Sequence, residues 1–139
     1  MRPPEEVLRE LVRQWIEKAE LDYHAATHLL EASDRLGQIV VFHCQQAAEK
    51  YLKALLVRHQ VQFPKTHNIR ELLDLTSTVA PEVARSLAGC VVLTPYGVDI
   101  RYPGDLPDLL PGQDTEAVEL ARLARKTVLG EVKAFLAGD

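Results

Sequence analysis

Apolar side chains recur every three or four positions along the first half of the chain, as they do in helices that bury one face. The first such stretch runs from about Glu5 to Ala32, and prolines followed by an acidic first turn are typical of a helix start. A second stretch runs from about Gln38 to His59. It should end there, because Pro64 follows and a proline disfavours helical geometry in the residue before it. The pattern therefore predicts two long helices joined by a short polar break.

Two shorter helices are predicted after this pair. Asn68 followed three positions later by Glu71 resembles a capping box, which favours a short helix over Asn68–Thr76. Pro81 can open a further short helix that stops at Gly89, since proline suits a first helical turn and glycine suits a helix end.

Residues 90–112 differ in composition from the helical stretches before them, because they include four prolines and three glycines. Long ordered loops in compact domains are usually functional or carry a short extended piece. Asp114 or Thr115 then caps a last helix that reaches about Leu136. The expected architecture is an all-α, up-and-down helical bundle, with two long helices, two short ones and a long C-terminal helix. We expect it to form one domain over residues 1–139.

Composition limits the class of protein. The chain has 139 residues, of which 47% are hydrophobic and 26% charged, as in ordinary globular proteins. No apolar run approaches the roughly 20 residues of a membrane span, and the N-terminus has no signal-peptide core, so we expect a cytoplasmic protein away from membranes. A net charge of −4 argues against a strongly basic nucleic-acid coat but leaves room for a local basic stripe. Cys44 and Cys90 are expected to be buried thiols in a reducing compartment.

When successive residues of the second long helix are placed 100 degrees apart around the helix axis, four polar residues fall on one side. They lie beside the arc that faces the core, with Glu49 at their edge, and we call them the polar stripe: His43, Gln46, Lys50 and Lys53. The stripe could be a solvated flank of the helix. Histidine and glutamine offer directed donors and acceptors, however, and Phe42 and Val57 lie on the same side, which favours a packed surface such as a dimer interface or a groove wall.

Four segments resemble one known family. The stretch "FHCQQAAEKYLKALL" is similar to the second-helix signature of HEPN domains, and "WIEKAELDYHAATHLL" is similar to the first helix of that family. The start of the third helix, "KTHNIRELL", and the motif before the last helix, "RYPG", resemble the corresponding HEPN segments. The resemblance covers about residues 10 to 135, with the motifs in the expected order.

The resemblance implies a helical bundle that usually forms a homodimer and is involved with nucleotides or RNA. Members often act beside a separately encoded minimal nucleotidyltransferase, as toxin and antitoxin. Many other members are metal-independent ribonucleases with an Arg-x(4–6)-His motif on or before the last helix. This chain departs from that motif, because no histidine follows Arg101, Arg122 or Arg125. A divergent ribonuclease and a non-catalytic structural dimerisation module therefore remain alternatives.

Several side chains are candidates for contact with a nucleotide or a partner. Arg101 can form two parallel hydrogen bonds to a phosphate group, and Tyr102 can stack on a base. Arg101 could equally form hydrogen bonds to loop carbonyls or to Asp99. His67 is either a capping or packing histidine or a proton-transfer group, and the two lysines of the polar stripe either hold phosphates or an acidic partner, or pair with local carboxylates.

The binding set that we expect is drawn from the polar stripe, the start of the third helix and the proline-rich turn: His43, Gln46, Lys50, Lys53, His67, Arg101 and Tyr102. Asp22, at the edge of the first helix's apolar face, is the carboxylate expected to pair with this set. The stripe and the turn should lie close together. We assign no catalytic residue and expect no cofactor.

The first helix carries one other arrangement of interest. Glu20, His24, His28 and Glu31 share a face, and histidines four positions apart have the spacing of metal ligands. This face lies opposite the apolar one, among further charged residues. The pattern therefore favours a solvated charged face, and we assign no metal site.

Overall fold

The structure is a computed structural model that describes residues 4–97 and 108–138. Within these ranges the chain forms five α-helices and two 3₁₀ segments, in the order α1 (Glu5–Ala32), η1 (Asp34–Leu36), α2 (Gly37–Arg58), α3 (Ile69–Ser77), α4 (Pro81–Ser86), η2 (Ala88–Tyr96) and α5 (Gln113–Leu136). The expected all-α bundle with a long C-terminal helix is confirmed.

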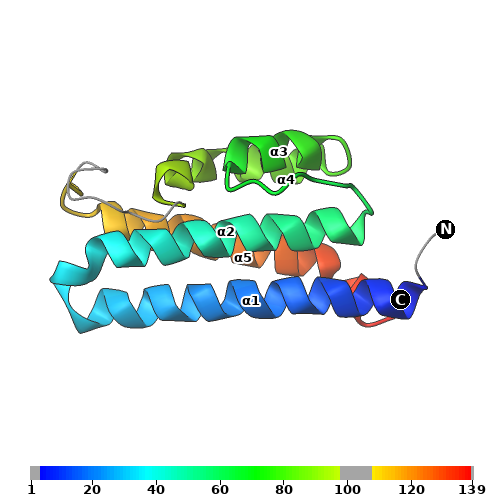
Figure 1. Cartoon of the computed structure of the whole chain (residues 1–139), viewed down its shortest axis with the longest axis horizontal. Helices are drawn as coiled ribbons and strands as arrows, with labels where there is room; N and C mark the ends of the chain where they lie inside the picture. The colour runs from blue at the N-terminus through cyan, green and yellow to red at the C-terminus, as the bar shows by residue number, and fades with distance from the viewer. Residues whose placement is uncertain (1–3, 98–107, 139) are drawn as a thin grey trace.

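The three long helices lie side by side along the long axis of the molecule (Figure 1). α1 and α2 run in opposite directions, and α5 packs against both and runs in the same direction as α2 (Figure 1). The segment from α3 to η2 returns along the outer side of α2, away from α1, and makes this parallel arrangement possible (Figure 1). α2 is therefore the central helix of the fold.

The central position of α2 explains its burial. All six residues from 51 to 56 are buried, so this part of the helix has no solvated side. A helix that is covered all round is expected in a core rather than at a surface. We expected the polar stripe to line one edge of this helix outside the core, and that expectation is wrong for Lys53, which is buried.

Local signals place most helix ends where the sequence predicted them. α1 has the predicted bounds, and α2 begins and ends one residue before its predicted bounds. Asn68 caps α3, because its side-chain oxygen accepts from the backbone N–H groups of Arg70 and Glu71. The predicted cap of the last helix is wrong: α5 begins at Gln113, after Gly112 with φ of 88°, and neither Asp114 nor Thr115 precedes it.

The expected loop after Cys90 is partly helical. Cys90 belongs to η2, whose side chains Cys90 and Leu93 are buried at an i, i+3 spacing. Residues 98–107, which include Arg101 and Tyr102, lie outside the described residues. The two cysteines are free and buried, as predicted.

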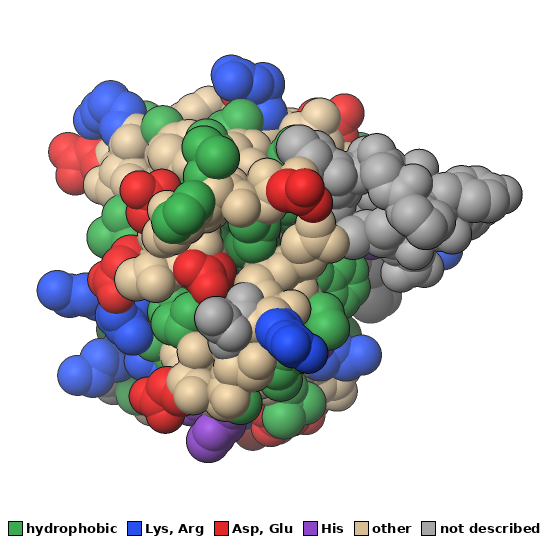
Figure 2. Space-filling view, turned by 90° about the vertical axis from the view of Figure 1, so that its left-hand side faces the viewer, with side chains coloured by type: hydrophobic (Ala, Val, Ile, Leu, Met, Phe, Trp, Pro, Cys, Tyr) green, Lys and Arg blue, Asp and Glu red, His purple; other side chains and the backbone are tan. Residues whose placement is uncertain are grey.

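Charged side chains of α1 hold the C-terminal end of α5 at one end of the bundle. At one end, Arg9 and Arg13 of α1 donate to the backbone carbonyls of Phe135 and Leu136, at 2.8 and 3.0 Å, where α5 ends. The last carbonyls of a helix have no partner within that helix, and Arg13 satisfies one of them. The Phe135 carbonyl accepts from Arg9 in addition to the backbone N–H of Gly138. At the other end, acidic and basic side chains are interspersed with apolar ones (Figure 2). In the described ranges, no helix is both long and apolar enough to cross a membrane.

Candidate functional site

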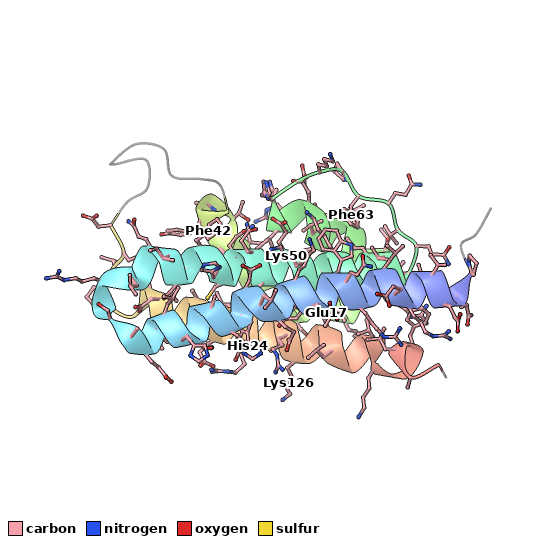
Figure 3. All side chains as sticks on the ribbon, turned by 60° about the horizontal axis from the view of Figure 1, so that its bottom comes forward. Glu17, His24, Phe42, Lys50, Phe63 and Lys126 are labelled. Carbon is pink, nitrogen blue, oxygen red and sulfur yellow. The ribbon has the colours of Figure 1, made fainter. Side chains whose placement is uncertain are left out.

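Asp22 of α1 joins two residues of the polar stripe on α2. Its Oδ1 atom lies 2.9 Å from Nδ1 of His43, and its Oδ2 atom lies 2.5 Å from Nζ of Lys50. Lys50 therefore lies between α1 and α2, on the same side of α1 as Phe42 and Phe63, while His24 of α1 and Lys126 of α5 project on the other side (Figure 3). The predicted pairing of Asp22 with the polar stripe is confirmed.

Glu49 of α2, the residue before Lys50, forms a second centre. Its Oε1 atom accepts from Gln45 Nε2 at 3.2 Å and faces His67 Nδ1 at 2.9 Å, and its Oε2 atom accepts from Lys53 Nζ at 3.0 Å. Only 4% of the Glu49 side chain is exposed, whereas 59% of the His67 side chain is. We call these four residues, Gln45, Glu49, Lys53 and His67, the Glu49 cluster. It consists of a buried carboxylate that faces the exposed imidazole of His67.

Lys53 does not reach a solvent-facing site. Its ammonium group pairs with Glu49 and lies 5.5 Å from the ring centre of Trp15 and 5.6 Å from that of Phe63. The two rings pack edge to face, with centres 6.1 Å apart. Ring faces attract cations, so Lys53 is held by neighbours within its own chain.

Two consecutive glutamines connect the Glu49 cluster to the segment after η2. Gln45 Nε2 also donates to the backbone carbonyl of His67 at 2.9 Å, and Gln46 Nε2 donates to Gln45 Oε1 at 2.7 Å and to the Gly97 carbonyl at 3.5 Å. Gly97 is the last described residue before the "RYPG" segment. Gly97 therefore lies beside Gln46, whereas Arg101 and Tyr102 lie outside the described residues, and their closeness to the polar stripe stays a prediction.

The structure brings together four of the seven predicted residues at the surface of α2: His43, Gln46, Lys50 and His67. Sequence reasoning missed Gln45, which is fully buried, and placed Glu49 only at the edge of the stripe. A helical wheel gave no signal for Gln45, because its angle lies away from the predicted core arc. The only available signal was the polar pair Gln45–Gln46 itself.

The opposite side of α1 holds a separate ion pair. Glu20 accepts two hydrogen bonds from Arg125 of α5, at 2.7 and 3.1 Å, and one from the Tyr51 hydroxyl of α2 at 2.5 Å. Burial raises the pKa of Glu20, but the bonds from Arg125 and Tyr51 outweigh it and leave the pKa below its usual value. Glu20 thus joins three helices, so the expected solvated face is wrong at this position. Across the described part of the chain, no group of three or more metal-binding side chains is positioned to hold an ion.

Comparison with known proteins gives one match. The family model described as "HEPN domain" matches residues 12–133, which is most of the chain. No curated protein and no solved structure matches the chain. The matched range contains every described residue of the α2 surface and of the Glu49 cluster.

Proposed function

The chain belongs to the HEPN domain family, and from this premise we propose that it binds a nucleotide or RNA at the surface formed by His43, Gln46, Lys50 and His67. Family membership supports a nucleotide- or RNA-associated function in general. The finer proposal is that the chain acts as a homodimer beside a separately encoded minimal nucleotidyltransferase, in a toxin–antitoxin-like pair.

The observation that carries this proposal is the fixed orientation of the polar side chains. His43 and His67 are each held through Nδ1 by a carboxylate, and Gln46 is held through Nε2 by Gln45. A solvated flank has no need for such support, because each held side chain loses rotamer entropy. Side chains that are oriented before a ligand arrives bind it at a lower entropic cost.

The surface is also partly apolar, which supports contact with a second macromolecule. The ring of Phe42 packs edge to face on His43, with centres 5.3 Å apart, and remains partly exposed. An apolar ring among directed polar groups is typical of interface cores and of surfaces on which bases stack.

Purification of the tagged chain from its own cells tests the proposal. Co-purifying proteins and nucleotides are both identified by mass spectrometry, and light scattering gives the mass of the purified complex. We expect a small nucleotidyltransferase, ribonucleotide material and twice the mass of one chain. Gln46→Ala should reduce the retained material several-fold while the helical content is unchanged. His28→Ala, which removes an exposed histidine of α1 outside this surface, is the matched control.

Retention of the same material by Gln46→Ala, or no retention by the parent chain, would reject the assignment.

A ribonuclease is the second candidate. The exposed His67 imidazole contacts the buried Glu49 carboxylate through Nδ1, and a histidine held in this way can act as a general base. Cleavage of RNA in the presence of a chelator, abolished in His67→Ala, would favour this candidate.

A further inference from the structure

The hydrogen-bond partners of the α2 surface determine which atoms are left for a ligand. Asp22 already accepts from the ammonium of Lys50, and Glu49 accepts from that of Lys53, so both carboxylates are acceptors only. The Nδ1 atoms of His43 and His67 face these carboxylates at 2.9 Å and must carry the ring proton. Whenever such a ring holds only this one proton, the remaining nitrogen, Nε2, is an acceptor.

The glutamine pair leads to the same result for Gln46. Gln45 Nε2 lies between a carboxylate oxygen and a backbone carbonyl, which can only accept, so its amide orientation is fixed. Its Oε1 atom then accepts from Gln46 Nε2, which also faces the Gly97 carbonyl. The Oε1 atom of Gln46 is left as a second kind of acceptor at the surface.

These three unused atoms form what we call the acceptor row: Nε2 of His43, Oε1 of Gln46 and Nε2 of His67. Within the described ranges none of them has a hydrogen-bond partner, and none is a buried unsatisfied atom. His43 and Gln46 are three residues apart on one helix and are therefore neighbours. Gln45 links the third member to them, because it accepts from Gln46 Nε2 and donates to the backbone carbonyl of His67, whose ring faces Glu49 on the same helix.

The cations of this surface are already neutralised. Lys50 pairs with Asp22 at 2.5 Å, and Lys53 is buried against Glu49 at 3.0 Å, so neither ammonium adds net positive charge for a phosphate group. The charge-neutralising part of phosphate binding comes from lysine and arginine side chains that have no carboxylate partner. The described surface therefore offers acceptors for donors rather than charge for anions.

We infer that the acceptor row recognises the hydroxyl donors of ribose, so that the surface selects ribonucleotides over deoxyribonucleotides. This inference rests on the proposed nucleotide-binding function and specifies what that site reads. The 2′-hydroxyl is the donor that distinguishes RNA from DNA. A site built to bond a hydroxyl discriminates against an analogue that lacks it, because the acceptors of the site are then left without partners.

Binding of three short oligoadenylates tests the inference: one of RNA, one of DNA, and one with 2′-O-methyl groups, which keep the 2′ oxygen but remove the donor. Each carries a fluorescent label, and affinity is measured by anisotropy with the full chain. We expect RNA to bind at least about tenfold more tightly than the other two, as one lost hydrogen bond of this kind predicts. We expect the affinity for RNA to fall by less than about tenfold between about 50 and about 200 mM salt, because few phosphates are neutralised.

Two variants separate the acceptor row from general electrostatics. His67→Ala removes one of the three acceptors, so it should reduce the ratio between the affinities for RNA and DNA and leave the affinity for DNA unchanged. Its fold should persist, because Glu49 keeps its bonds from Gln45 and Lys53 and the His67 carbonyl belongs to the backbone. Lys65→Ala removes an exposed cation nearby and should leave the ratio between RNA and DNA unchanged.

The outcomes distinguish the inference from the function on which it rests. Equal affinities for RNA, DNA and the 2′-O-methyl probe would overturn the inference while the nucleotide-binding function stands. Tight binding of RNA that is unaffected by His67→Ala would also overturn it. If none of the probes binds, the proposed function fails and the inference fails with it.

Discussion

Glu49 is the side chain on which most of the polar contacts near the centre of the molecule depend. It is nearly fully buried and accepts from Lys53, Gln45 and His67, which come from two different parts of the chain. A buried carboxylate is tolerated only when it is paired and hydrogen-bonded. Glu49 therefore both neutralises Lys53 and orients the exposed His67.

Removing Glu49 should cost more stability than removing its lysine partner. Glu49→Leu leaves the buried ammonium of Lys53 without a counter-ion and two further donors without their acceptor, so we expect a loss of about 3–5 kcal/mol in the free energy of unfolding. Lys53→Met keeps the other two donors to Glu49 and should cost clearly less. Urea unfolding followed by circular dichroism measures both.

The double variant Glu49→Leu/Lys53→Met is the control for this comparison. It removes both charges, so it should recover part of the loss seen in Glu49→Leu. Equal losses in the two single variants would refute the predicted ranking, and a fully additive double variant would show that Lys53 and Glu49 do not interact.

The contact between η2 and α2 depends on a glycine. A Cβ atom built on Gly97 would lie 2.5 Å from Cδ of Gln45, which is closer than packed atoms can approach. Gln45 cannot move aside cheaply, because its amide is bonded to Glu49 and to the His67 carbonyl. Any larger residue at position 97 must therefore disturb the glutamine pair.

Gly97→Ala should thus destabilise the chain by about 1–3 kcal/mol, the usual cost of overpacking. Gly130→Ala is the matched control, because the added methyl group would meet nothing within 4 Å in the middle of α5. It should stabilise the chain by about 0.5–1 kcal/mol, since alanine is the better helix former. Thermal unfolding of both variants measures the difference, and shifts of the same sign would refute the close approach at Gly97.

Sequence reasoning succeeded for the helices whose signals are local and failed where packing decides. The bounds of α1 and the Asn68 cap of α3 follow from nearby residues, and the sequence predicted both. The burial of Lys53 and Gln45 could not be predicted in this way, because a helical wheel assumes one buried face and α2 has neighbours on all sides. η2 was missed because its period is three and Pro95 lies within it.

The bundle as a whole is held by contacts that join its three long helices. Glu20 of α1 links Tyr51 of α2 to Arg125 of α5, and the buried thiols of Cys44 and Cys90 lie in the same continuous core. Burial raises the pKa of each thiol, and Asp114 raises that of Cys44 further. The core is therefore sensitive to conditions that ionise these groups.

Stability should fall in alkaline solution because of these two thiols. Their pKa values rise from 9.0 to about 12 for Cys44 and to about 11 for Cys90 in the folded chain. Below pH 9 the thiols are protonated in both states, whereas above it the unfolded chain ionises first, so stability is lost as the pH rises towards the folded values. Each thiol should contribute a slope of up to about 1.4 kcal/mol per pH unit.

Urea unfolding at several values between about pH 8 and about pH 9.5 measures this decline while most tyrosine side chains, whose ordinary pKa is about 10, are still protonated. Cys44→Ala should lower the stability near neutral pH, because it leaves a small cavity in the core. Its decline with pH should nevertheless be shallower than that of the parent chain, because one of the two buried thiols no longer resists ionisation. His28→Ala keeps both thiols and should reproduce the slope of the parent chain. A Cys44→Ala curve that runs parallel to the parent curve would mean that the Cys44 thiol ionises as easily in the folded chain as in the unfolded one, which its complete burial in the core argues against.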